Sequence, residues 1–250
     1  MASLLYLSVR PERDAATAEH ASFRTALGVP AARLDRLDLV TGALPDDVFD
    51  RYDGFVVGGS PFNVTDAAKS ETQRRVERDL ERIAENALQG GRPAFFTCFG
   101  IGVVTRLLGG VVTTSHPEQT SAAEVRTTPE AAQDPLFSPA GPAFTAFTAH
   151  KEGSAHVPAD AVRLAGNDAC PVQAYRVGDR LYATQFHPEP SPRDFADRMT
   201  FYRTTGYFDP RAFISVQEAV LSATVVEPAR ILGRFADLVG TAGAVGVLRR

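Results

Sequence analysis

The sequence predicts an α/β fold whose sheet is built largely from parallel strands. Through the first half of the chain, short apolar runs alternate with longer amphipathic segments, which is the order that βα units produce. The chain has 250 residues, 44% of them hydrophobic. A single domain of this length can bury a large core.

The first strand is predicted over residues 4–9, and the first helix over residues 14–27, where Gly28 ends it. Residues 54–57 form the next apolar run of strand length. This run leads directly into Gly-Gly-Ser-Pro at 58–61.

The clearest predicted helix begins after Ser70. Gln73 follows three residues later, which is the spacing of a capping box. Apolar residues then recur at helical spacing up to residue 88, and Gly-Gly at 90–91 ends the pattern.

A further strand is predicted over residues 93–97, followed by Cys98 and a helical stretch that ends at residue 108. The cysteine therefore stands where a strand gives way to a helix. After about residue 120 strands dominate. They are predicted over residues 122–127, 143–149, 162–165, 172–176 and 180–186.

The last two of these strands form a predicted hairpin, because Val-Gly-Asp at 177–179 suits a tight primed turn. From Ser191 onward the chain is mostly helical, and no linker separates this part from the rest. We expect one domain over residues 1–250, with a catalytic region at about 1–190 and a helical C-terminal extension at about 191–250.

Composition excludes several classes of function. Twenty-six basic and 30 acidic residues give a net charge of −4, without the basic stretch that nucleic-acid binding requires. The apolar run at 4–9 is too short for a signal peptide or a membrane span, so we expect a cytoplasmic protein. Two cysteines, Cys98 and Cys170, are too few for a disulfide framework. No Cys/His cluster has zinc-site spacing, and we expect neither a metal nor an organic cofactor.

Cys98 is the candidate nucleophile. A thiol at a strand-to-helix turn lies on a sharp elbow, where the helix N-terminus favours the thiolate and the next backbone N–H is free to hold an oxyanion. The alternative is a buried structural cysteine, since free cysteine is among the most buried residue types.

The sequence His187-Pro188-Glu189 favours the nucleophile. In extended chain, positions i and i+2 face the same side, so the His187 ring and the Glu189 carboxylate can lie together. The carboxylate would fix the imidazole tautomer and leave the other ring nitrogen to exchange a proton with Cys98. All three residues follow predicted strands, where open parallel sheets place their sites.

Six short segments also share a pattern with a known family. They are VVGGSP at 56–61, CFG at 98–100, LGG at 108–110, AH at 149–150, CPVQAYR at 170–176 and TQFHPE at 184–189. In this order, over roughly residues 50–190, they resemble the class I glutamine amidotransferases, and in particular stand-alone domains similar to the glutaminase part of GMP synthase.

The resemblance implies a three-layer α/β/α, flavodoxin-like fold with a mainly parallel central sheet. It also implies that Cys98 attacks the side-chain amide of glutamine, that His187 carries the proton and that Glu189 orients His187. The backbone N–H groups of Gly59 and Phe99 would form the oxyanion hole.

The chain departs from the family pattern Gly-x-Cys-x-Gly-x-Gln at two positions. The first glycine is Phe96, which requires a small opposing residue or a shifted turn. The glutamine is Gly102, which removes polar contacts to a glutamine substrate and leaves room for a larger one. Ser60, Gly102 and His150 are expected near the substrate, although Ser60 and His150 are also consistent with structural roles.

The predicted function is that of a glutamine amidotransferase-like enzyme of glutamine metabolism. It would hydrolyse a carboxamide, glutamine or a γ-glutamyl-type amide, or transfer the ammonia to a separate synthetase partner. The main alternative is a weak or inactive regulatory or binding module on the same fold. A nucleotide site at Gly100–Thr105 matches the dinucleotide pattern poorly. Relatives that act as deglycases or peptidases usually have histidine at the position of Phe99.

Overall fold

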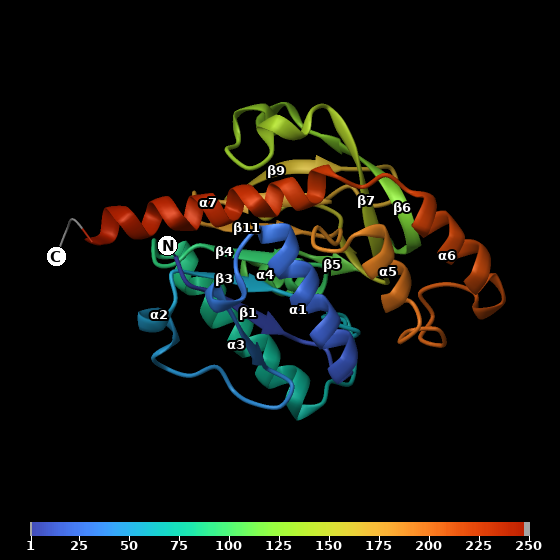
Figure 1. Cartoon of the computed structure of the whole chain (residues 1–250), viewed down its shortest axis with the longest axis horizontal. Helices are drawn as coiled ribbons and strands as arrows, with labels where there is room; N and C mark the ends of the chain where they lie inside the picture. Colours follow the sequence, from blue (N-terminus) through green and yellow to red (C-terminus); the bar gives the residue numbers. More distant parts are fainter. Residues whose placement is uncertain (1, 248–250) are drawn as a thin grey trace.

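The computed structural model describes residues 2–247, with side chains described for residues 2–242; Met1 and residues 248–250 of the expected domain lie outside the described residues. Nine strands of the described chain form one sheet (Figure 1). In sheet order they are β2 (Leu34–Asp38), β1 (Leu4–Ser8), β3 (Gly54–Val57), β4 (Ala94–Thr97), β11 (Leu181–Thr184), β10 (Ala174–Val177), β9 (Ala161–Gly166), β6 (Glu118–Thr127) and β7 (Ala143–His150).

The sheet has a parallel part and an antiparallel part. Strands β2, β1, β3, β4 and β11 pair in parallel. From β11 through β10, β9 and β6 to β7 the pairing is antiparallel. A small second sheet pairs β5 (Val112–Thr113) with β8 (Gly153–Ser154).

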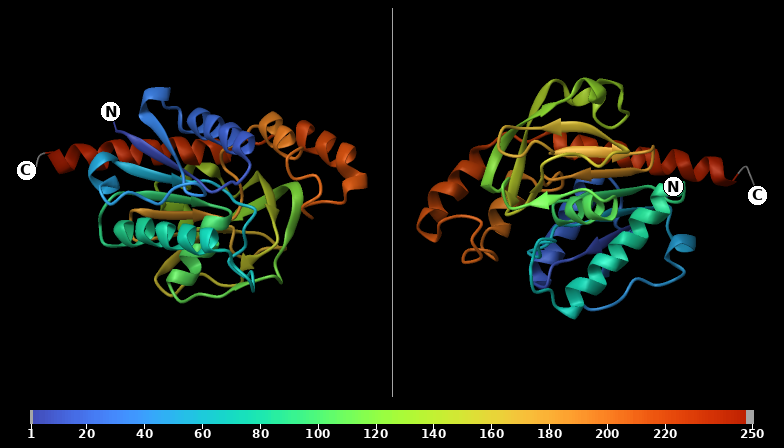
Figure 2. Two further views of the ribbon diagram at one scale, coloured as in Figure 1. Left: turned by 90° about the horizontal axis from the view of Figure 1, so that it is seen from below. Right: turned by 180° about the vertical axis from the view of Figure 1, so that it is seen from behind.

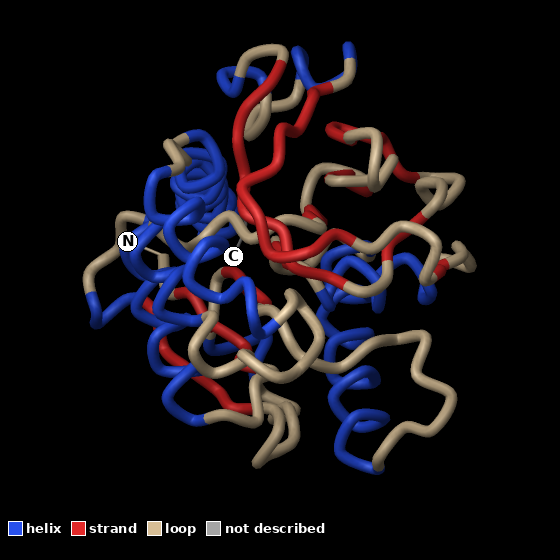
Figure 3. The backbone as a smooth tube through the Cα atoms, turned by 90° about the vertical axis from the view of Figure 1, so that its right-hand side faces the viewer, coloured by secondary structure: helices blue, strands red, loops and turns tan. Residues whose placement is uncertain are grey.

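Helices cover both faces of the sheet (Figure 3). Helices α1 (Arg13–Leu27) and α7 (Glu227–Val247) pack together on one face, and α3 (Glu71–Leu88) and α4 (Phe99–Leu107) on the other. Helices α5 (Pro192–Arg198) and α6 (Phe213–Ser222) lie at the end of the molecule opposite the C-terminus (Figure 2). The short helix α2 (Val48–Arg51) precedes β3. The predicted three-layer α/β/α fold is therefore confirmed.

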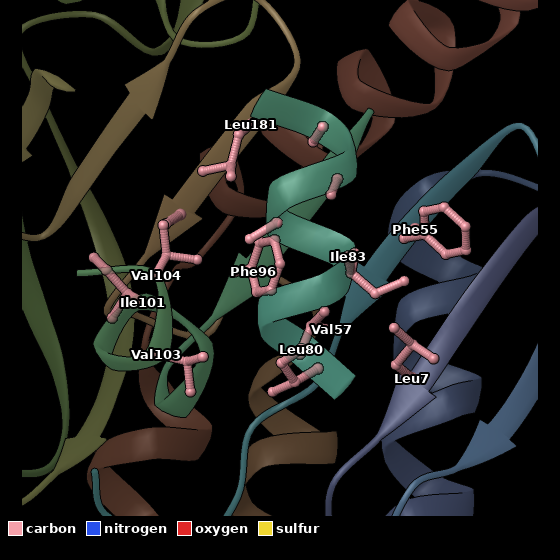
Figure 4. Close-up of a cluster of buried hydrophobic side chains, with 14 of the residues drawn as sticks. Leu7, Phe55, Val57, Leu80, Ile83, Phe96, Ile101, Val103, Val104 and Leu181 are labelled. Carbon is pink, nitrogen blue, oxygen red and sulfur yellow. The ribbon is translucent and has the colours of Figure 1, made fainter. Parts of the chain in front are cut away.

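Alternating side chains of the buried strands build the two cores. Leu5 and Leu7 of β1 face α3, while Leu4 and Tyr6 face α1 and α7. In Figure 4, Leu80 and Ile83 of α3 lie over side chains from the strands. The helical spacing noted in the sequence thus corresponds to one buried face of α3.

Most predicted elements are present, with ends that differ by a few residues. Strand β2 was not predicted, because its alternating Asp and Arg residues give it little apolar character. Ser70 caps α3 by accepting the Gln73 N–H, but the Gln73 side chain donates to Asn63 O, so the capping box is only half formed. Gly178 has a positive φ, as expected, but the connection between β10 and β11 has three residues and not the two of a tight primed turn.

Phe96 is accommodated by a small residue, the first of the two expected solutions. An added Cβ at Gly100 would lie 3.0 Å from Phe96 Cβ and 3.1 Å from Cδ1 of its ring. The glycine therefore lets the first turn of α4 pass close to a buried phenylalanine. None of the helices in the described part of the chain combines the length and apolarity needed to cross a bilayer.

We expect Gly100→Ala to lower the free energy of unfolding by about 1–3 kcal/mol, because the new methyl group overpacks against Phe96. The matched control is Gly240→Ala in α7, where an added Cβ meets nothing within 4 Å. That change should raise stability by roughly 0.5–1 kcal/mol through helix propensity. Urea unfolding measures both, and a Gly100→Ala protein as stable as wild type would contradict this account of the elbow.

Candidate active site

Cys98 forms the turn between β4 and α4. Its backbone angles are φ 51° and ψ −103°, and it is the only non-glycine residue with positive φ in the described chain. Such strain persists only where the surrounding structure enforces it, and it is typical of a nucleophile elbow. The Cys98 N–H donates to Thr184 O at 2.8 Å, which ties the elbow to the end of β11.

His187 reaches the same edge of the sheet from β11. This strand lies parallel to β4, with Thr184 beside Thr97, so the chain leaves both strands side by side. The His187 N–H donates to Phe147 O at 2.8 Å and anchors the segment against β7. Cys98 and His187, only 7% and 4% exposed, line one cavity.

Glu189 lies beside His187, as the i, i+2 spacing predicts. The Nδ1 atom of His187 is 3.2 Å from Glu189 Oε1, and the same oxygen accepts from Arg198 Nη1 at 2.6 Å. Burial lowers the pKa of His187, but the Glu189 carboxylate and the Cys98 side chain raise it more, to about 9. Burial raises the pKa of Glu189, and Arg198 and His187 together bring it well below its ordinary value.

A second layer of buried charge lies behind this pair. Glu19 of α1 is 3.3 Å from Arg198 Nη1 and 2.6 Å from Arg10 Nη2, and it accepts the Tyr6 hydroxyl at 2.6 Å. The sequence reasoning missed Glu19, Arg10 and Arg198. One signal was available, since Glu19 stands with residues 15, 23 and 27 on the apolar face of the predicted helix.

The two expected oxyanion donors differ in their surroundings. The Gly59 N–H donates to Glu19 Oε1 at 3.3 Å, so it is engaged in this structure. A Cβ at Gly59 would lie 2.7 Å from His187 Cε1, so no larger residue fits beside the imidazole. Phe99 is the first residue of α4, where a backbone N–H has no partner within the helix.

Two cavities meet at Cys98. The His187-side cavity is the one that Cys98 shares with His187, and the Gly102-side cavity is the one it shares with Phe99 and Gly102. Together with the open solvent at their mouths, they hold about 410 Å³ and 300 Å³ of empty space. Ser60 lines both cavities, yet its hydroxyl donates to Val9 O at 2.9 Å.

His150 lines the Gly102-side cavity, with its ring nitrogens already engaged. Nδ1 lies 2.8 Å from Glu152 O and Nε2 lies 2.8 Å from Glu118 Oε2. Both partners are acceptors, because His150, Asn167 and other donors outweigh burial and lower the pKa of Glu118. Both ring nitrogens are therefore engaged within the protein, and His150 acts as part of the cavity wall.

Two groups of residues have the spacing of metal ligands in the described chain: Glu118, His150 and Cys170, and Glu19, His187 and Glu189. In the first group the carboxylate accepts from His150, Asn167 and Gln173. Burial raises the pKa of Cys170 to about 12, which keeps it a thiol. In the second group the carboxylates are matched by Arg10 and Arg198. The carboxylates of both groups are therefore already engaged by donors within the protein.

The raised pKa of His187 predicts a pH-dependent contribution to stability. Because the folded value of about 9 exceeds the unfolded value of about 6.5, the protonated ring stabilises the fold fully below pH 6.5. The contribution, about 3 kcal/mol, is lost as the pH rises through 9. Urea unfolding of wild type and His187→Asn between pH 6 and 10 should show a steeper decline for wild type, and parallel curves would refute the assignment.

Residues 37–205 match the protein family described as glutamine amidotransferase class-I. The GMP synthase [glutamine-hydrolyzing] of Vibrio atlanticus (strain LGP32) is 30% identical over 138 residues, which are 55% of this chain and 24% of that protein. The chain therefore matches about a quarter of the length of this curated relative.

Solved structures show the same fold. A glutamine amidotransferase from Thermotoga maritima has a TM-score of 0.72 at 18% identity, over 96% of this chain and 99% of that one. A glutamine amidotransferase from Methylobacillus flagellatus has a TM-score of 0.68 at 14% identity, over 95% of each chain. Because the family match runs from β2 to the segment beyond α5, more than half of the chain, the protein belongs to the class I glutamine amidotransferase family.

Proposed function

We propose that the protein hydrolyses a carboxamide, glutamine or a γ-glutamyl-type amide, through a cysteinyl thioester. The observation that carries the proposal is the strained elbow at Cys98, which opens into the same cavity as the buried His187–Glu189 pair. Family membership supports the same class of reaction.

In the proposed reaction, His187 takes the proton of the Cys98 thiol. Sγ then attacks the amide carbon, and the C=O electron pair moves to the oxygen. The oxyanion is held by the Phe99 N–H. Collapse of this intermediate breaks the C–N bond, and His187 gives its proton to the departing nitrogen. Water then attacks the thioester while His187 takes the water proton. The C–S bond breaks, the acid is released, and His187 returns the proton to the sulfur, which restores the thiol.

The remaining groups act through His187. Glu189 orients the ring through Nδ1, which leaves Nε2 for the proton exchange with Cys98. Arg198 holds the Glu189 carboxylate and is a positioning residue in this proposal. Gly59 becomes a second oxyanion donor when its N–H turns away from Glu19.

The ammonia released by this reaction can leave as a product or pass to a partner protein. Water alone completes the hydrolysis, and a separate protein that consumes ammonia is the partner class we propose for a transfer reaction. The alternative of an inactive binding module requires that Cys98 lack reactivity, which a labelling experiment measures directly.

We expect a glutamine analogue with an electrophilic diazo ketone to label Cys98. Mass spectrometry should find the adduct on the Cys98 peptide in wild type and in Cys170→Ser, and on neither cysteine in Cys98→Ser. The Cys98→Ser change should also lower amide hydrolysis by about a thousandfold or more. Labelling of Cys170 instead, or full activity of Cys98→Ser, would overturn the proposal.

Gly102 supplies a test of glutamine recognition. A Cβ there would lie 3.1 Å from Val64 Cγ2 and 3.4 Å from Glu152 Oε1, so a side chain fits after a small movement of Val64. We expect Gly102→Gln to lower the KM for glutamine about fivefold, roughly 1 kcal/mol for one hydrogen bond, with little change in kcat.

Gly102→Ala is the control, because it adds the steric cost without the amide group. Equal KM values for the two variants, or a lowered melting temperature of Gly102→Gln without better glutamine turnover, would show that the glycine serves packing alone.

A further inference from the structure

We propose that the His187-side cavity binds the amine-side substituent of an N-substituted γ-glutamyl amide, and that this substituent is aromatic or aliphatic and uncharged. The inference rests on the proposed hydrolysis at Cys98 and names the substrate class of that site. It follows from the positions of the two cavities and from the chemistry of their walls.

The direction of the reaction assigns the two cavities. The departing nitrogen takes its proton from His187, so it lies on the His187 side of Cys98, together with any group bonded to it. The oxyanion faces the Phe99 N–H, at the border of the cavity lined by Phe99 and Gly102. We assign the acyl chain to this second cavity, because the departing nitrogen takes the His187 side. A primary amide releases ammonia, which needs no cavity of its own.

The walls of the His187-side cavity suit an apolar group. Phe195, Met199, Tyr202, Tyr207 and Phe208 all contribute to them, and all come from the segment beyond residue 190. Aromatic and thioether side chains bind apolar groups by contact area and offer them no fixed charge. Ligand sites in proteins are typically built in this way, with a few polar groups among apolar ones.

This wall is held firmly against the rest of the molecule. The Tyr202 hydroxyl accepts from Arg10 at 3.0 Å, and the Thr120 N–H donates to Tyr207 O at 3.0 Å. The ring of Phe195 stacks on Phe147 with 4.5 Å between centroids. The positions of these wall residues are therefore set by contacts within the protein.

The test compares kcat/KM for L-glutamine and for the γ-glutamyl amides of methylamine, isobutylamine, benzylamine and glycine. We expect the benzylamide to be cleaved about tenfold or more faster than the methylamide, with the glycine derivative no better than the methylamide. Met199→Ala should reduce the ratio of benzylamide to methylamide at least threefold. Leu221→Ala, an exposed change on α6 outside the cavity, should leave that ratio unchanged.

The ratio of two substrates on one enzyme is independent of the folded fraction, so a destabilised Met199→Ala protein still gives a valid result. Preference for glutamine or the methylamide, or for the glycine derivative, would overturn this inference while leaving amide hydrolysis intact. An unchanged ratio in Met199→Ala would overturn it as well. Cleavage of none of these amides would reject the proposed function together with the inference.

Discussion

The parallel pairing of β4 with β11 is the contact on which the site depends. Thr97 and Thr184 are paired at the ends of these strands, and the Cys98 N–H continues the pairing by donating to Thr184 O. Both strands are buried on both faces, so a slip of one residue would turn every side chain to the wrong core. The packing of the sheet therefore fixes where the thiol and the imidazole lie relative to one another.

A row of buried charges of alternating sign lies beside the paired ends of β4 and β11 and ends at His187. Arg10, Glu19, Arg198, Glu189 and His187 follow one another as neighbours, and all are less than 10% exposed. Each charge loses its hydration on folding, and each recovers much of that cost from the neighbour of opposite sign. These residues come from the segment after β1, from α1, from α5 and from the segment after β11. The contacts that hold the imidazole therefore also join the first and last parts of the domain.

The sequence predicts the three residues around the thiol better than the buried charges that hold them in place. Strand order and helical spacing depend on local pattern, so the elbow at Cys98 and the placement of His187 beside Glu189 could be predicted. Arg198 could not, because its partner is chosen by tertiary packing, and Glu19 was hidden among apolar neighbours of its helix. The hydrogen bond from the Gly59 N–H to the Glu19 carboxylate could not be predicted either, because it depends on where Glu19 lies in the fold.

The strained backbone at Cys98 also bears on how the protein is made. Synthesis proceeds from the N-terminus, so the chain contains Cys98 long before it contains His187, Glu189 or Arg198. The unusual φ of the elbow is held by a hydrogen bond to Thr184, which also arrives late. A nascent chain on the ribosome thus carries an ordinary, unstrained cysteine, and the proposed nucleophile comes into being only as the domain closes.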